Sequence, residues 1–283
     1  MILGSTLVSA LTPPFTIQKG FLRPNSIEGN RLDREIGRLF QNPAGISQAR
    51  KIQFNLESSQ DFFGYDFVQA AYLIPGPVLN VAFGLASFQA SDISRVTGVG
   101  ATKPTILGQF AHKNEVYNLS LGKMIFPGLS VGTAVQLYRQ QLDNDSSRSF
   151  SVDTGFLWDI HPQLWVGAYS RNWISTAFEW VGSNASERLD RHIISEAGIL
   201  ALGSQLIFLS DFSENHRVFG ELAVVPSFSL IGDAVWGDKF SFRRYGLGAI
   251  LDLTTVTIQY LHLSVAEVGL GSDQDQLGLL LRF

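Results

Sequence analysis

Hydrophobic and polar side chains alternate with a period of two along most of this chain. Tyr117, Leu119 and Leu121, for example, are interleaved with Asn118 and Ser120. This alternation is typical of β-strands, because successive side chains of a strand point to opposite faces. It predicts fourteen strands, over residues 50–58, 64–75, 78–89, 108–124, 129–141, 147–160, 163–173, 190–201, 204–212, 216–225, 228–236, 241–252, 254–263 and 275–283.

The two faces of these strands differ in character: one is large and apolar, and the other is small or polar. Val131, Val135 and Leu137, for instance, oppose Ser130 and Gln136. A soluble β-sandwich also alternates, but its outward face would be richer in Lys and Glu. We therefore predict an all-β fold, a transmembrane antiparallel up-and-down β-barrel of about 14 strands whose large apolar face meets lipid.

The connections between the strands alternate in length. Short turns follow the even-numbered strands, whereas longer links follow several odd-numbered ones, at residues 90–107, 174–189 and 264–274. Short periplasmic turns and longer external loops are typical of bacterial outer-membrane barrels, and an even strand count places both termini in the periplasm. Residues 105–124 could form two strands and break this parity, but we expect one long strand there.

The chain ends on a strand with an alternating apolar series and a C-terminal aromatic residue. This ending resembles the terminal signal by which bacterial outer-membrane proteins reach their insertion machinery. A soluble domain would leave such a strand as an exposed edge where chains usually fray. We predict that the assembly signal consists of Leu277, Leu279, Leu281 and Phe283.

A segment of different period precedes the strands. Leu32, Ile36, Leu39 and Phe40 fall on one face of an expected helix, and Arg34 and Arg38 lie elsewhere around it. The motif that follows it is expected to end this helix, because a proline disfavours helical backbone at the residue before it. The motif consists of Asn42, Pro43, Ala44 and Gly45. Residues 1–10 are either a truncated signal peptide or a mature N-terminus with an added Met.

Composition excludes several classes of protein. Charged residues make up 16% of the 283 positions, against about a quarter in a typical globular protein, yet no run of 18 apolar residues exists. The net charge of −4 argues against a nucleic-acid partner, and the absence of cysteine excludes disulfides and thiolate metal sites. No P-loop spacing or nucleophile elbow is present, and the five histidines lack metal-ligand spacing. We expect no enzyme activity, cofactor or metal.

Several charged residues lie within the predicted strands. A charge on the lipid face near the midplane costs about 2–4 kcal/mol, so we assign these residues to the lumen. Lys123 and Arg139 are given the same assignment. The acidic members of this group are Asp153, Glu196, Glu221 and Asp233.

With these features, the chain resembles the FadL/PorV-like outer-membrane proteins, which include the fatty-acid channel and components of type IX secretion. The resemblance rests on the short helix followed by Asn42-Pro43-Ala44-Gly45, on Tyr65-Asp66-Phe67 in the second strand, on the strand count and on the terminal phenylalanine. It covers about residues 30–283. It implies that residues 11–47 fold into the lumen as a plug and that residues 48–283 form the barrel.

Two functions follow from the resemblance. One is a plugged, partner-binding barrel of PorV type, an accessory of secretion or envelope assembly. The other is a gated, FadL-like channel for hydrophobic or amphipathic small molecules. The absence of a long second hatch favours the first, with protein partners bound at residues 90–107 and 174–189 or at the periplasmic face. The lumenal acids either pair with each other and with plug residues such as Arg34 and Arg38, or line a polar path.

Overall fold

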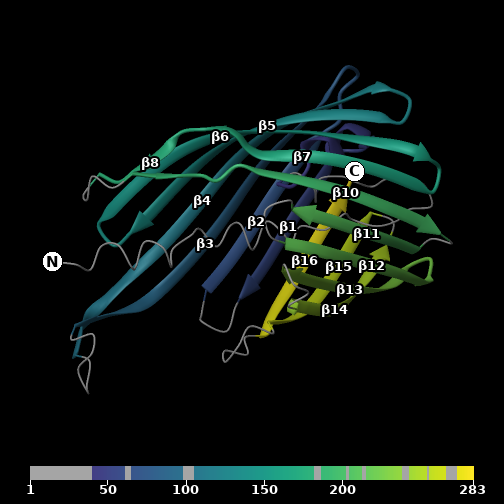
Figure 1. Cartoon of the computed structure of the whole chain (residues 1–283). Coiled ribbons are helices and arrows are strands. Elements are labelled where there is room, and N and C mark those ends of the chain that lie inside the picture. Colours follow the sequence, from purple (N-terminus) through teal and green to yellow (C-terminus); the bar gives the residue numbers. More distant parts are fainter. Residues whose placement is uncertain are drawn as a thin grey trace.

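The computed structural model describes residues 40–60, 65–97, 105–181, 186–201, 204–211, 215–237, 242–253, 255–265 and 273–283. Across these residues, fourteen antiparallel strands close into one barrel, and two short strands form a separate sheet (Figure 1). The prediction of a fourteen-stranded, all-β barrel is therefore confirmed. Region 105–124 lies within a single strand, as expected.

The barrel strands follow one another around the wall in chain order, so each strand pairs with its sequence neighbours. Their bounds are β1 (Gln53–Gln60), β2 (Tyr65–Ile74), β3 (Asn80–Thr97), β4 (Thr105–Phe126), β5 (Leu129–Leu142), β6 (Asp145–His161), β7 (Leu164–Ser175), β10 (His192–Ala201), β11 (Ser204–Asp211), β12 (Asn215–Val225), β13 (Phe228–Gly237), β14 (Phe242–Leu253), β15 (Val256–Val265) and β16 (Asp273–Arg282). The separate sheet pairs β8 (Ala177–Glu179) with β9 (Ser186–Arg188).

The two faces of the wall differ as the alternation predicts. On β4, Tyr117, Leu119 and Leu121 are exposed on the outside, whereas Asn118 and Ser120 are buried on the inside. A large exposed apolar surface is unfavourable in water but stable in hydrocarbon, provided that the backbone is fully hydrogen-bonded. The outward face of this barrel therefore suits a lipid bilayer. Within the described part of the chain, no helix is long and apolar enough to cross a membrane.

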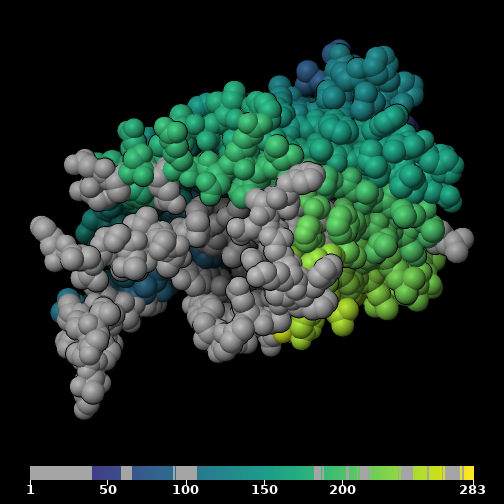
Figure 2. Space-filling view, viewed as in Figure 1, coloured from purple at the N-terminus to yellow at the C-terminus, as the bar shows by residue number. Residues whose placement is uncertain are grey.

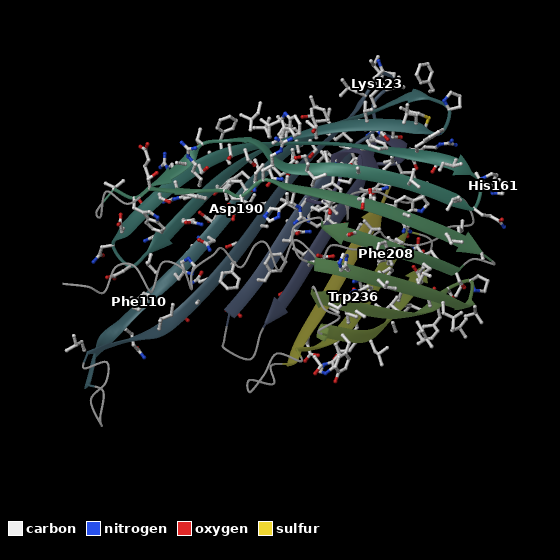
Figure 3. The ribbon with its side chains drawn as sticks, viewed as in Figure 1. Phe110, Lys123, His161, Asp190, Phe208 and Trp236 are labelled. Carbon is white, nitrogen blue, oxygen red and sulfur yellow. The ribbon has the colours of Figure 1, made fainter. Side chains whose placement is uncertain are left out.

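Aromatic side chains lie near both edges of the outward apolar surface. Phe208, His216 and Trp236 cluster on β11–β13, with ring centroids 5.9–6.3 Å apart (Figure 3). Phe126 and Trp158 are exposed beside the short turns at the opposite rim. Such girdles are typical of membrane barrels, because aromatic rings favour the region of the lipid headgroups.

The last strand closes the barrel against the first. β16 pairs with β1, with Leu279 opposite Leu56, and the amide of Phe283 donates to the carbonyl of Ile52 at 2.9 Å. This pairing satisfies backbone groups that would otherwise face lipid at several kcal/mol each.

The wall is taller on one side of the barrel. β3 and β4 contain 18 and 22 residues, whereas β1 and β11 contain 8 each. The long strands extend well past the short ones at the rim opposite the tight turns (Figures 1 and 2). The expected loop 90–107 is therefore largely wrong: β3 runs to Thr97 and β4 starts at Thr105. The end of β3 contains only two apolar residues among residues 91–97, so it shows no hydrophobic period.

The ladder between β6 and β7 contains an irregularity. Its register shifts between Val152 and Thr154, and Asn172 adopts a positive φ of 53° opposite this point. The extra residues bulge the β7 strand, as is common where a ladder is interrupted. The expected loop 174–189 is also partly wrong, because β7 continues to Ser175 and β8 and β9 follow. Strands of three residues are too short to show an alternation.

Candidate functional site

The described part of the N-terminal segment forms a short helix inside the barrel. This 3-10 helix, η4 (Pro43–Gln48), begins after Asn42, whose side chain accepts a hydrogen bond from the amide of Ala44 at 3.0 Å. The motif therefore starts a helix, whereas the expected helix before it lies outside the described residues, so its end at this motif stays a prediction. Asparagine at the cap and proline in the first helical position form a start signal, because proline lacks an amide that would need a partner there.

Three glycines on neighbouring strands form the seat of η4. Gly122, Gly132 and Gly155 lie directly opposite one another across β4, β5 and β6, and we call them the glycine row. A Cβ at Gly132 would overlap the backbone of Pro43 and Ala44, and one at Gly122 would lie 2.6 Å from Cγ1 of Ile46. The missing side chains therefore allow the helix to approach the wall closely.

Side-chain amides anchor both ends of η4. Nδ2 of Asn42 donates to Oε1 of Glu196 at 2.6 Å and to the carbonyl of Phe156 at 3.1 Å. At the other end, Nδ2 of Asn80 donates to the carbonyls of Ile46 and Ala49 at 2.8 and 2.9 Å. The Asn80 bonds add side-chain donors to carbonyls at the end of the helix, where intrahelical partners run out. We call residues 40–49 with these contacts the plug seat.

The four predicted lumenal acids are all buried on the inward face. Glu196 holds the plug seat through Asn42, and Asp153 accepts hydrogen bonds from the amide of Asn172 at 2.8 Å and from Nε2 of Gln136 at 2.5 Å. Glu221 accepts from Nε2 of Gln205 at 3.0 Å, and Asp233 lies opposite Phe219. Glu221 and Asp233 are diagonal neighbours on β12 and β13, whereas Asp153 and Glu196 lie on β6 and β10, so the structure does not gather the four carboxylates into one site.

Two further assignments are wrong. Lys123 and Arg139 lie on the outward face, in the same parity as Tyr117 and Leu137, and both are exposed. Figure 3 shows Lys123 and Phe110 at opposite ends of β4. Strand parity dictates this placement, since a side chain an even number of residues from Tyr117 shares its face.

The expected plug helix lies mostly outside the described residues. The members that the structure does not describe are Leu32, Arg34, Ile36, Arg38 and Leu39. The pairing of the two arginines with the lumenal acids therefore stays a prediction. Phe40 is described and is buried beside Ile46, in an apolar cluster that includes Phe67, Phe88 and Phe178.

A second apolar cluster follows the inner wall and reaches the plug seat at Ala44. Trp165 takes part by covering Gly198 of the neighbouring strand, where a Cβ would overlap its indole ring. We call the barrel members of this cluster the apolar strip. They come from β6, β7 and β11–β15 and are Leu157, Trp165, Ile207, Phe219, Ile231, Ile250 and Leu261.

The residues of the predicted assembly signal lie on the outward face at the closing seam. Leu277 and Phe283 are exposed, and Leu279 and Leu281 are partly buried. Their role in assembly stays a prediction.

Sequence reasoning missed the glycine row, although a signal for it was present. Gly122 and Gly132 are equally far from the turn at residue 127, and Gly132 and Gly155 flank the turn at residues 143–144 in the same way. Hairpin register follows from the position of the turn, so the three glycines could have been aligned from the sequence. The sequence signal for the apolar strip was weaker, because each strand contributes only one of its members and no single stretch of sequence shows the cluster.

No protein-family model matches the chain, and no curated protein matches it significantly in sequence. Among solved structures, it is similar to the toluene transporter TodX of Pseudomonas putida, with a TM-score of 0.53, 10% identity, and coverage of 92% of this chain and 98% of that one. For a TodX variant described as a monoaromatic hydrocarbon channel, the TM-score is 0.55 at 9% identity, and the match covers 87% of this chain and 93% of that one. For a FadL homologue of Pseudomonas aeruginosa, the TM-score is 0.49 at 10% identity, and the match covers 94% of this chain and 97% of that one. At this identity the TodX structures establish a shared barrel fold.

Proposed function

We propose that this protein is an outer-membrane channel for small hydrophobic or amphipathic molecules, and that residues 40–49 gate it. The apolar strip, which reaches the plug seat at Ala44, is the observation that carries this proposal. The shared fold with TodX, a toluene transporter, supports it.

An apolar inner wall is unusual for a channel that serves polar solutes. Porin lumens are lined by polar side chains, because their solutes and the surrounding water need hydrogen bonds. Here the inward positions of seven strands supply Trp165, Phe219 and five aliphatic residues. Burial of apolar surface gains roughly 25 cal/mol per Å², so such a strip favours an apolar solute over a polar one.

The plug seat provides the gate. Ala44 packs directly on the apolar strip, and Asn42, two residues before it, is fixed by Glu196 on the same inner wall. A solute that follows the strip therefore meets this helix. Because η4 is short and held by few side chains, its displacement is a local opening that costs less than unfolding the barrel.

The alternative, a partner-binding barrel of PorV type, lacks a comparable observation. The extended β3–β4 and β6 strands offer surface at the taller rim, but nothing among their described residues points to a particular protein. In the orientation typical of outer-membrane barrels, the rim of tight turns and the C-terminal Phe283 face the periplasm and the taller rim faces outward. The N-terminus lies outside the described residues, so its expected periplasmic location stays a prediction.

Uptake of radiolabelled toluene tests the channel. Cells that produce the barrel are compared with cells that carry an empty vector, and labelled sucrose serves as the polar solute. We expect toluene uptake to rise at least threefold and sucrose uptake to stay unchanged. Equal toluene uptake in the two strains, or a parallel rise in sucrose uptake, would overturn the proposal.

A pair of variants connects uptake to the apolar strip. Ile231→Asp introduces a carboxylate into the strip, whereas Ser147→Asp introduces the same group on the inward face outside it. Both variants are first checked for a folded barrel by the heat-dependent shift on gels. We expect the first to remove most of the gain in uptake and the second to retain it. The opposite order would show that solutes do not follow the strip.

A further inference from the structure

Four charged residues form a row on the outside of the tall wall. Lys113 and Glu115 lie on β4, Arg139 on β5 and Arg148 on β6, and all four share the outward parity of Tyr117. Glu115 lies opposite Arg139, which lies opposite Arg148. We call these four residues the charged row.

The charged row carries more positive than negative charge. Oε1 of Glu115 lies 2.8 Å from Nζ of Lys113, and its Oε2 lies 3.8 Å from Nη1 of Arg139. Arg148 is exposed and has no acidic partner among the residues that the structure describes. One carboxylate therefore serves two cations, and a third cation stands directly opposite one of them. Like charges opposite each other destabilise a sheet, unless an anion bridges them.

The position of the charged row relates it to the membrane. The next outward row toward the tight turns is Tyr117, Leu137 and Phe150, and apolar residues dominate from there. From Tyr117 to Ile125 the strand rises about 26 Å at roughly 3.3 Å per residue, or about 20 Å along the axis at a tilt of about 40°. This length is close to the apolar band of about 25 Å that outer-membrane barrels present. The charged row thus lies at the level of the lipid headgroups.

We propose that the charged row binds the phosphate groups of lipid A in the outer leaflet. Facing guanidinium groups at the headgroup level can hold one phosphate between them, since each offers paired donors that match phosphate oxygens. The row lies toward the taller rim, which faces outward in the proposed orientation, and lipid A supplies phosphates at that surface. The inference rests on this orientation and not on the channel activity.

Lys123 provides an internal comparison. It is also an exposed outward cation of β4, but it lies near the tight turns, where it stands opposite Val131. A variant at this position changes the net charge of the barrel by the same amount per residue without touching the charged row.

Binding of lipid A to the purified barrel in neutral detergent tests the proposal, with affinity measured by titration. We expect the double variant Arg139→Gln/Arg148→Gln to weaken binding at least tenfold and Lys123→Gln to change it less than twofold. Removal of both phosphates from lipid A should weaken binding to the wild-type barrel at least tenfold. Equal affinity of the double variant and the wild-type barrel, or of the two forms of lipid A, would overturn the proposal.

Further probes identify the source of the phosphate. Phosphatidylglycerol and inorganic phosphate are each expected to bind at least tenfold more weakly than lipid A, and equal binding of either would refute lipid A as the partner. Lipid A should also raise the temperature of the heat-dependent gel shift for the wild-type barrel but not for the double variant. Toluene uptake by the double variant should match the wild-type rate, so a failure of this proposal is distinguishable from a failure of the channel.

Discussion

At the scale of single residues, Asn42 combines two roles. Its Oδ1 caps η4 through the amide of Ala44, and its Nδ2 binds Glu196. Aspartate caps helices as well as asparagine does, but it has no amide to donate and would bring a second carboxylate against Glu196. The two roles can therefore be separated by substitution.

Asn42→Ala and Asn42→Asp should both loosen the plug seat, with aspartate the more harmful. A reporter cysteine at Ile46, which is fully buried in the wild type, reacts with a maleimide only when the seat opens. Loss of the cap and one buried hydrogen bond costs about 1–2 kcal/mol, so Asn42→Ala should speed labelling roughly fivefold to thirtyfold. Slower labelling with aspartate than with alanine would show that the cap alone matters.

The glycine row should tolerate no side chain. Gly132→Ala places a methyl group against the backbone of Pro43 and Ala44, which cannot rotate away, at a cost of about 1–3 kcal/mol. Gly220→Ala is the matched control, because its Cβ would meet only Leu206 at 3.7 Å. We expect faster labelling of the Ile46→Cys reporter in the first variant alone. Equal rates would show that η4 does not rest on this row.

The face of the wall on which a residue lies was predicted correctly where the alternation along its strand was followed, and wrongly where the charge of the residue was followed instead. The inward placement of Asp153 and Glu196 follows from the alternation of their strands. Lys123 and Arg139 obey the same rule, but their charge suggested the lumen, and the wall places them near the edges of the apolar band instead. Long basic side chains are tolerated there, because they reach the headgroups.

At the scale of elements, the outward residues of a strand change from apolar to polar with their depth in the membrane. On β5, Val135 lies in the middle of the outward apolar band, whereas Gln141 lies on the same face past Arg139, opposite Lys113 of the charged row. Val135→Arg should lower the free energy of unfolding in lipid by about 2–4 kcal/mol, and Gln141→Arg should change it little. Denaturant titration of the barrel refolded into lipid vesicles measures both. Similar losses for the two variants would place the membrane edge elsewhere.

Strand boundaries were predictable inside the apolar band and not beyond it. Within the band, lipid on one face and a packed lumen on the other impose the alternation that the sequence shows. Beyond it, residues 91–97 at the end of β3 include only two apolar residues, Ile93 and Val96, so the sequence shows no alternation there and only its β-branched residues favour a strand. The short β8 and β9 strands are set by hydrogen bonds to neighbouring segments, such as the amide of Thr176 to the carbonyl of Phe150 at 3.0 Å.

At the scale of the whole molecule, strand count and closure followed from the sequence because each turn fixes the register of its hairpin. The arrangement inside the lumen did not follow, since it depends on contacts such as that between Asn42 and Glu196, which are 154 positions apart. The central claim at this scale is that solutes pass only when residues 40–49 leave their seat.

A covalent tether across the plug seat tests this claim most directly. The chain has no cysteine, and Nε2 of Gln48 lies 3.4 Å from Oγ of Ser130, so Gln48→Cys/Ser130→Cys can be bridged by dibromobimane, whose fluorescence reports the bridge. Each single cysteine variant, treated with the same reagent, is the control. We predict that bridging reduces toluene uptake to the level of the empty vector, whereas both controls keep the wild-type rate. Undiminished uptake by the bridged barrel would contradict gating by this segment.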